Sequence, residues 1–320
     1  MSSFSVGDDL DLFHRSRANP LLTPQRWPRP INAVMNAGAT LVDGETVLLC
    51  RVEDRRGISH LTVARSPDGV SNWLVDDQPL MSPHPDLPSE VWGVEDARIT
   101  RIDELDCWVI SYTAFGKGGP AVALAKTTDF RTVERLGVVC PPEDKNASLL
   151  SRRVDGHFVM FHRPMTAIGS GDVWASKSAD LLSWSTPAPV FGARPGGFWD
   201  SARIGIGPPP LETPHGWLVI YHGVRQTVAG SLYRVGLAML DLDEPTKVIR
   251  RSDEWVLGPS EDYELIGDVP GVIFPCGLIH EPDSGQLRIY YGAADCRIGM
   301  AYADYDQVLE YVMAADTPAE

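Results

Sequence analysis

The stretch WGVEDAR, residues 92–98, places two adjacent carboxylates, Glu95 and Asp96, between a tryptophan and an arginine, in front of an apolar run. Two such acids form either a surface charge pair or a site in which one of them gives a proton to a bound molecule. Glu95 is expected to bond neighbouring backbone or to pair with Arg98. The choice for Asp96 depends on whether the fold turns it toward a cavity.

Other polar residues lie at the ends of short β-rich runs, and cations are frequent among them. The set comprises Asn36, Arg51, Glu95, Asp96, Lys145, His162, Arg163, Asp200, Arg203, His222 and Asp295. The whole chain carries 28 basic against 43 acidic residues, a net charge of -15. Because surface charges are screened beyond about 8 to 10 Å, a local basic cluster can still attract an anion. If one cavity gathers these residues, an anion-binding pocket follows.

A repeat of three strand-like runs indicates how these residues come together. The third run of each unit ends at Asp68, Asp129, Asp180, Asp241 and Asp304, at intervals of 61, 51, 61 and 63 residues. The first run reads NAGATL, EDARIT, NASLL, DSARIG or VIFPCG. The recurring aspartates are typical of turns, because their side chains bond backbone amides. Room remains in each unit for a fourth, outer strand.

Five short-stranded units of this length predict an all-β fold, a five-bladed β-propeller. We expect residues 1–320 to form a single catalytic domain of this kind, with residues 1–30 as an N-terminal segment packing on it. A two-sheet sandwich is the alternative, but a sandwich gives no reason for this period. In a propeller the inner strands line the central axis, so polar residues at their ends converge on one funnel. Trp92 and Trp199, just before the acidic motifs, either anchor the core or stack on a sugar.

Composition excludes several classes of protein. No stretch is basic enough to follow a phosphodiester backbone, so nucleic acid is not an expected partner. The acidic start MSSFSVGDDLDLF and the lack of a long apolar run argue against a signal peptide and a membrane partner, and favour a cytoplasmic protein. The five cysteines are scattered without a CxxC, which argues against disulfides and a metal site. No cofactor is expected, and whether copies assemble into a homo-oligomer is left open.

Several motifs together resemble glycoside hydrolase family 130, the mannoside phosphorylases and related β-mannosidases. The resemblance runs from ANPLLTP (18–24) to IGMAYADYDQVLEYV (298–312). Its most specific pieces are VEDARI, FVMFHRP, FWDSARIGIGPPP, WLVIYHGV, DVPGVIFPCG and YYGAADCRIGMA. Members of this family are five-bladed β-propellers, in agreement with the repeat.

The resemblance implies an inverting reaction in which phosphate attacks the anomeric carbon of a β-mannoside and α-mannose 1-phosphate leaves. It makes Asp96 the proton donor, in several members by way of a mannose hydroxyl. Phosphate, the one co-substrate, is then held by Arg163, Arg203 and His222. Substrate binding falls to Asn36, Arg51, Lys145, Asp200 and Asp295.

The chain departs from the family pattern at four positions, which include KNAS at 145–148 and Gly271 in place of the usual asparagine. Ala97 stands where the family usually has proline, and Arg203 where it usually has lysine. A hydrolytic β-mannosidase and a non-catalytic sugar-binding propeller are the alternatives. Hydrolytic members place acidic residues where this chain keeps Arg163, Arg203 and His222, which favours phosphorolysis. Linkage and acceptor sugar stay open.

Overall fold

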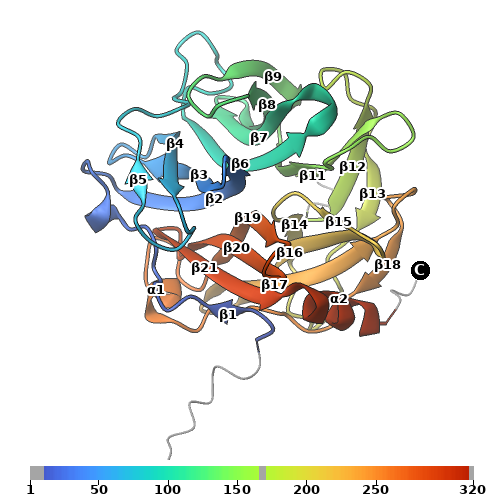
Figure 1. The fold of residues 1–320 in the computed structure, drawn as a ribbon. Helices are drawn as coiled ribbons and strands as arrows, with labels where there is room; N and C mark the ends of the chain where they lie inside the picture. Colours follow the sequence, from blue (N-terminus) through green and yellow to red (C-terminus); the bar gives the residue numbers. More distant parts are fainter. Residues whose placement is uncertain (1–10, 166–170, 317–320) are drawn as a thin grey trace, which may run out of the picture.

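The computed structural model describes residues 11–165 and 171–316, whose strands form five antiparallel blades around one axis (Figure 1). The first two blades count as one eight-stranded sheet because a single parallel pair, Ser59 opposite Gly93, joins them. Within each blade, consecutive strands pair side by side, as the repeat predicts. The fold is therefore a five-bladed β-propeller, and the sandwich alternative is wrong.

The strands of the first three blades follow one another from the axis outward. Blade 1 holds β2 (Ala33–Val42), β3 (Glu45–Glu53), β4 (Ser59–Ser66) and β5 (Leu74–Val75). Blade 2 holds β6 (Gly93–Ile102), β7 (Cys107–Gly116), β8 (Gly119–Thr127) and β9 (Glu134–Cys140). Blade 3 holds β10 (Asp144–Leu149), β11 (Phe158–Pro164), β12 (Val173–Ser178) and β13 (Ala188–Phe191).

The last two blades are less regular. Blade 4 holds β14 (Arg203–Ile206), β16 (Gly216–Thr227), β17 (Gly230–Leu240) and β18 (Val248–Arg251), with β15 (Leu211–Thr213) beside β16. Blade 5 holds β19 (Ile273–Glu281), β20 (Gln286–Ala293), β21 (Arg297–Asp304) and β1 (His14–Arg15). The helical segments are η1 (Pro24–Arg26), η2 (Asp103–Leu105), α1 (Asp262–Leu265) and α2 (Tyr305–Ala314). None of the described helices is long and apolar enough to cross a membrane.

The recurring aspartates form turns, as predicted. Asp68 Oδ1 accepts hydrogen bonds from the backbone amides of Val70 (2.8 Å) and Ser71 (2.7 Å). Asp129, Asp180 and Asp241 bond the amides two and three residues ahead in the same way. In the fifth unit Asp304 instead caps α2, its Oδ1 accepting from the amide of Gln307 at 3.0 Å. The side chains thus fix the end of each third strand locally.

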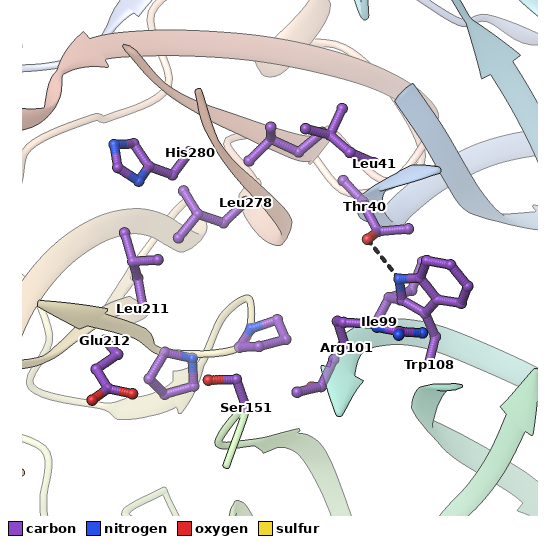
Figure 2. Close-up of a pocket in the computed structure, with 15 residues that line it drawn as sticks. Thr40, Leu41, Ile99, Arg101, Trp108, Ser151, Leu211, Glu212, Leu278 and His280 are labelled. Atoms are coloured by element: carbon purple, nitrogen blue, oxygen red, sulfur yellow. Dashed lines mark hydrogen bonds between the residues drawn. The ribbon is translucent and has the colours of Figure 1, made fainter. Parts of the chain in front are cut away.

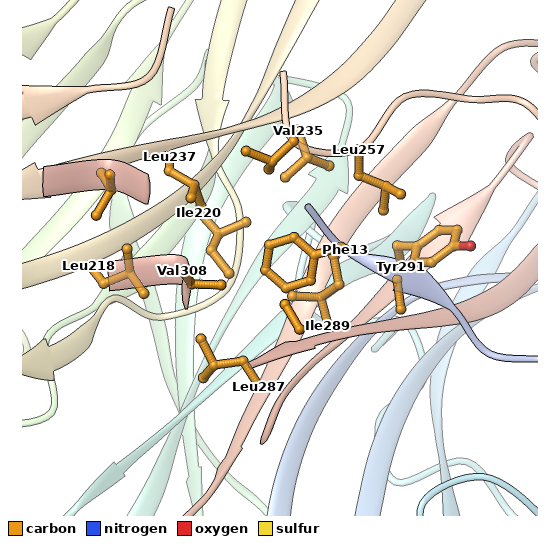
Figure 3. Close-up of a cluster of buried hydrophobic side chains, with 14 of the residues drawn as sticks. Phe13, Leu218, Ile220, Val235, Leu237, Leu257, Leu287, Ile289, Tyr291 and Val308 are labelled. Atoms are coloured by element: carbon orange, nitrogen blue, oxygen red, sulfur yellow. The ribbon is translucent and has the colours of Figure 1, made fainter. Parts of the chain in front are cut away.

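The N-terminal segment closes the ring, because β1 supplies the outer strand of blade 5 by pairing with β21 (Figure 1). Phe13 enters the apolar cluster between blades 4 and 5, where it lies among Ile220, Val235 and Ile289 (Figure 3). Val308 of α2 joins the same cluster, so both ends of the described chain seal one seam. Residues 1–10 of the predicted N-terminal segment lie outside the described residues.

The hydrophobic core is divided among the seams between blades. One large buried cluster lies between each pair of neighbouring blades, built from alternate residues of the facing strands. All five cysteines are free, and four of them are buried. The inner strands are thereby held rigidly around the axis, which is what positions the site.

Candidate active site

A β-bulge interrupts the inner strand of four blades. The register shifts between Met35 and Gly38 in β2, Glu95 and Arg98 in β6, Lys145 and Ser148 in β10, and Pro275 and Gly277 in β19. Asn36, Asp96 and Asn146 sit in three of these bulges with left-handed backbone, at φ 48°, 51° and 58°. Asparagine and aspartate tolerate this conformation better than most residues, and a bulge redirects a side chain. Three polar side chains are thus turned out of the regular strand alternation.

These bulges lie along a cavity of about 470 Å³, which we call the axial cavity. Its lining comes from the first three strands of the blades, with at least one residue from each blade, and from the loops beside them. It consists of Asn36, Arg51, Glu95, Asp96, Thr113, Phe115, Pro120, Lys145, Asn146, Arg163, Met165, His222, Tyr233, Val269, Val272, Phe274 and Asp295. Seven of the nine predicted site residues are therefore together, and the ED motif faces a cavity, not solvent.

Arg51 organises the acidic side of the cavity. Its Nη1 donates to Asp96 Oδ1 at 3.2 Å and its Nη2 donates to Glu95 Oε1 at 3.0 Å. Asn36 Nδ2 donates to the same Asp96 oxygen at 2.8 Å. The expected pair between Glu95 and Arg98 is wrong, because Arg98 turns into the protein and donates to the Asp96 backbone carbonyl at 2.6 Å. Two carboxylates thus share one guanidinium.

The three carboxylates of this side have different pKa values. Burial tends to raise the pKa of Asp96, but Arg51, Arg98 and the Asn36 hydrogen bond outweigh it and hold the pKa below its usual range. Burial raises the pKa of Glu95 to about 7 against the opposing effect of Arg51. Burial, with the nearby Asp96 charge, raises the pKa of Asp295 to about 6. At neutral pH Asp96 is therefore charged, whereas burial favours a proton on Glu95.

The basic side of the cavity consists of Lys145, Arg163 and His222, with Arg203 behind Tyr233. Lys145 in β10 stands directly opposite Arg163 in β11, a like-charge pair that is unfavourable in an antiparallel ladder. Arg163 Nη1 donates to the Ile204 carbonyl at 3.2 Å, and Arg203 Nη2 donates to Tyr233 Oη at 2.6 Å. Among residues 11–165 and 171–316, no carboxylate lies within ion-pair distance of Lys145, Arg163 or Arg203. Cations gathered without acidic partners point to an anion as their ligand.

The pKa values of Arg163 and His222 reflect the crowding of cations on this side of the cavity. Burial and the neighbouring Arg203 lower the pKa of Arg163 to about 10, so it stays charged at neutral pH. Burial and the nearby cations depress the pKa of His222 well below its usual value, so its ring is neutral. Within the described chain, neither buried ring nitrogen of His222 has a hydrogen-bond partner. One of them must carry a hydrogen and is free to donate to a bound group.

A buried His162–Asp144 pair supports the basic side from behind. Asp144 precedes Lys145 and His162 precedes Arg163, and His162 Nδ1 lies 2.6 Å from Asp144 Oδ2. The other ring nitrogen of His162 lies 3.0 Å from Ser176 Oγ. Cys140 completes a group whose potential metal-ligand atoms lie within 4.8 Å of one another. Since both His162 nitrogens already have protein partners, we interpret the group as a structural lock on β10 and β11.

Two predicted residues do not line the cavity. Arg203 reaches its wall through Tyr233, which does line it. Asp200 lies elsewhere: it is fully buried, 2.8 Å from Arg251 Nη2 and 2.9 Å from Arg194 Nε, and it accepts from Tyr221 Oη. The expectation that Asp200 binds substrate is therefore wrong. The repeat aligned DSARIG with EDARIT, but β14 begins only at Arg203, so Asp200 precedes the inner strand.

The two tryptophans of the acidic motifs, Trp92 and Trp199, have different environments. Trp199 is 4% exposed and stacks on Tyr221 at 5.6 Å, so it anchors the core. Trp92 is 42% exposed, and its ring lies 5.5 Å from Phe115 of the cavity wall. Only Trp92 is available for contact with a ligand near the cavity.

Sequence reasoning missed several lining residues. Asn146 carried a usable signal, because its Asn-Ala dipeptide repeats the Asn-Ala and Asp-Ala of residues 36–37 and 96–97. Tyr233 and Phe274 carried none, since an aromatic residue in a strand usually belongs to a core. They flank the His222 ring at centroid distances of 5.9 and 4.5 Å.

A second cavity, the far cavity, lies at the other end of the inner strands and measures about 520 Å³ (Figure 2). Thr40, Ile99 and Leu278 line it, several residues further along the strands that present Asn36, Asp96 and Phe274 to the axial cavity. The Trp108 indole nitrogen donates to Thr40 Oγ1 at 3.0 Å across its wall (Figure 2). None of the predicted site residues lines it.

The comparisons with known proteins identify a family for the whole chain. The family model described as beta-1,4-mannooligosaccharide phosphorylase matches residues 13–314. The beta-1,4-mannooligosaccharide phosphorylase of Ruminococcus albus is 33% identical over 314 residues, which cover 95% of this chain and 92% of that protein. The 1,2-beta-oligomannan phosphorylase of a Thermoanaerobacter species is 35% identical over 302 residues, 90% of this chain and 96% of that protein.

A solved structure extends the similarity to the fold. The structure of beta-1,2-mannobiose phosphorylase from Listeria innocua, in complex with beta-1,2-mannobiose, matches with a TM-score of 0.85 and 29% identity. The match covers 94% of this chain and 99% of that one. Sequence motifs, blade count and these matches all lead to one assignment. The chain belongs to glycoside hydrolase family 130.

Proposed function

We propose that this chain catalyses inverting phosphorolysis of a β-mannoside, in which inorganic phosphate attacks the anomeric carbon and α-D-mannose 1-phosphate leaves. The observation that carries the proposal is the division of the axial cavity. Asp96 and Glu95 are bonded to Arg51, whereas Lys145 and Arg163 stand opposite each other on neighbouring strands, with no carboxylate of the described residues within ion-pair distance. An inverting displacement needs its acid and its nucleophile on opposite faces of the sugar.

The residue roles follow from these positions. Asp96 is the general acid for the departing glycosidic oxygen. Arg163, Arg203 and the neutral His222 hold phosphate, and Lys145, opposite Arg163, joins them. Charge-assisted bonds from such groups orient one phosphate oxygen and replace part of its hydration shell. The remaining residues of the acidic side, Asn36, Arg51 and Asp295, bind the mannosyl unit.

Hydrolysis is the competing reaction, and the charge distribution disfavours it. An inverting hydrolase needs a second carboxylate to activate water on the face opposite the acid. All three carboxylates that line the axial cavity in the described chain, Glu95, Asp96 and Asp295, belong to the acidic side. Phosphate arrives already anionic and needs no such base, so the basic side suits it better than water.

A reverse-reaction screen tests the proposal. α-Mannose 1-phosphate is mixed with mannose, glucose, N-acetylglucosamine, and β-1,2- and β-1,4-mannobiose, and released phosphate is measured. The relatives named above act on different linkages, so both mannobioses belong in the panel. Release with at least one acceptor, abolished in Asp96→Asn, is expected. Failure with every acceptor, together with phosphate-independent release of mannose from β-mannosides, would establish the hydrolase instead.

A further inference from the structure

The proposed acid and its neighbour share one cation in a buried setting. Arg51 forks between them, with one nitrogen on Asp96 Oδ1 and the other on Glu95 Oε1. The side chains of Arg51, Glu95 and Asp96 are 17%, 17% and 11% exposed. The second oxygen of each carboxylate has no protein partner among the hydrogen bonds of the described residues. Each acid therefore keeps one oxygen free to hold or pass a proton.

The resting charges of this pair conflict with a simple acid role for Asp96. Its Oδ1 accepts from both Asn36 and Arg51, which stabilise the carboxylate form. A deprotonated Asp96 cannot protonate a leaving oxygen. Glu95 receives only the Arg51 bond and is the acid whose pKa burial raises. These contacts favour a proton on Glu95 over one on Asp96.

We propose that Glu95 and Asp96, bridged by Arg51, form a carboxyl pair that holds one shared proton, which Glu95 carries at rest and Asp96 delivers. This inference rests on the proposed phosphorolysis. Glu95 acts through Asp96 and is a positioning residue for the catalytic proton. The physical reason is charge balance, since one guanidinium compensates one buried carboxylate, and a second uncompensated charge is costly away from water.

The surroundings of the pair favour retention of one proton. The charged and titratable groups that act on Glu95 or Asp96 are Arg51 and Glu53 from β3, Arg98 from β6, Lys145 from β10, Cys276 from β19 and Asp295 after β20. Glu53 and Asp295 oppose a second negative charge, while Lys145 and Arg98 favour it. Bound phosphate, an anion at the basic side, offsets the effect of Lys145 during turnover.

The proton balance closes over one turnover. Asp96 gives the shared proton to the glycosidic oxygen as the bond from that oxygen to C1 breaks, and an oxygen of HPO₄²⁻ forms the new bond to C1. The new ester leaves the displacement still carrying the phosphate hydrogen. Because the second pKa of a phosphate monoester is about 6, it gives up that proton near neutral pH, and the pair takes it back.

The test is the pH profile of kcat/KM for a β-mannoside at saturating phosphate. Wild-type activity should fall on the alkaline side as pH rises through neutrality, because the shared proton is lost. Glu95→Gln should move this limb by at least about one unit toward acid, with about tenfold lower kcat/KM at alkaline pH for each unit. Glu53→Gln, which removes the other carboxylate near Arg51 (3.6 Å), should move the limb in the same direction but by less than Glu95→Gln, because Glu53 acts on the pair only through its charge. If the alkaline limb of the kcat/KM profile does not move in an active, folded Glu95→Gln variant, the proposal is overturned.

An infrared titration of the substrate-free protein gives a readout that does not depend on activity. In an Asp295→Asn background, which removes the other carboxyl of the axial cavity whose pKa is raised, a protonated carboxyl band should disappear as pH rises from about 6 to about 8. Adding Glu95→Gln should eliminate that band. If Asp295→Asn shows no such band, the shared proton does not exist, even if the double variant fails to fold. A wild type that shows the band but no phosphate-dependent reaction would contradict the proposed function alone.

Discussion

The two cavities at opposite ends of the inner strands are similar in size, about 470 and 520 Å³, but differ in how their charges are paired. In the far cavity Arg101 binds Asp103 and Asp106, while Glu212 is held by Arg152 at 2.8 Å. The Arg101 guanidinium also lies over the Trp108 ring (Figure 2). In the axial cavity Arg51 binds Glu95 and Asp96, but Lys145 and Arg163 have no carboxylate within ion-pair distance among the described residues. Volume therefore does not distinguish a site in this fold, whereas the pairing of its charges does.

The backbone of the inner strands also differs between the axial cavity and the far cavity. Around the axial cavity the inner strands bulge, and Asn36, Asp96 and Asn146 adopt left-handed φ angles. Toward the far cavity the same strands run in regular register, from Gly38 to Val42 and from Arg98 to Ile102. Irregular backbone in a stable fold costs free energy, commonly of the order of 1 kcal/mol per residue, and it persists where it positions functional groups.

The largest expected effect is at Asp96. Asp96→Asn keeps the size of the side chain and its place between Asn36 and Arg51, but it removes the proton donor. Turnover should fall by roughly 10²- to 10⁴-fold, the usual contribution of a general acid, with little change in melting temperature. Steady-state kinetics and a thermal melt check this. Near-normal turnover in the folded variant would remove Asp96 from the mechanism and undo the contrast between the two cavities.

A smaller effect is expected on the basic side. Arg163→Ala removes a charge-assisted contact worth roughly 1.5 to 3 kcal/mol, so the KM for phosphate should rise about ten- to a hundredfold. The KM for the mannoside should change much less. A phosphate KM that stays constant while the mannoside KM rises would reassign Arg163 to sugar binding.

Arg203 allows a finer test, because lysine keeps its charge. Arg203→Lys should retain phosphorolysis within about tenfold in kcat/KM, since a lysine loses the paired guanidinium geometry but not the cation. Arg203→Glu should abolish it. Equal kinetics for the two variants would show that Arg203 acts only by packing against Tyr233, with which it now hydrogen-bonds.

The smallest effect is expected in the far cavity, which supplies the matched control. Arg101→Ala removes an arginine whose partners, Asp103 and Asp106, are themselves exposed. Exposed ion pairs contribute about 0 to 1 kcal/mol to stability, so unfolding should change little and both KM values should stay within about twofold. A phosphate KM that rises as much as in Arg163→Ala would mean that the two ends do not differ in function.

The repeating strands and turns could be predicted from the sequence. Contacts between residues far apart in the chain could not. Blade count and strand order followed from the recurring turn aspartates, because each turn is fixed within a few residues. Strand β1 had no signal, since two residues, His14 and Arg15, gain their structure only by pairing with β21. The Arg51 bond to Glu95 was likewise invisible because it joins two blades.

The site was predictable to the extent that it follows the repeat. Asn36, Asp96, Arg163 and His222 came from strand ends and motifs, and all four line the axial cavity. The prediction that Asp200 lines the site failed because two similar motifs, DSAR and EDAR, occupy different places relative to the start of the inner strand. The opposite shifts of the Glu95 and Asp96 pKa values depend on burial and on partners that only the fold specifies.

The most direct test of the central claim is a phosphate titration of the reaction followed by proton and phosphorus NMR. With a β-mannoside accepted in the reverse screen, the rate should rise saturably with phosphate, and the product should be α-mannose 1-phosphate. Arg163→Ala should shift the saturation to higher phosphate without changing the product. Free mannose as the sole product, at a rate indifferent to phosphate from zero to saturating concentration, would contradict the account.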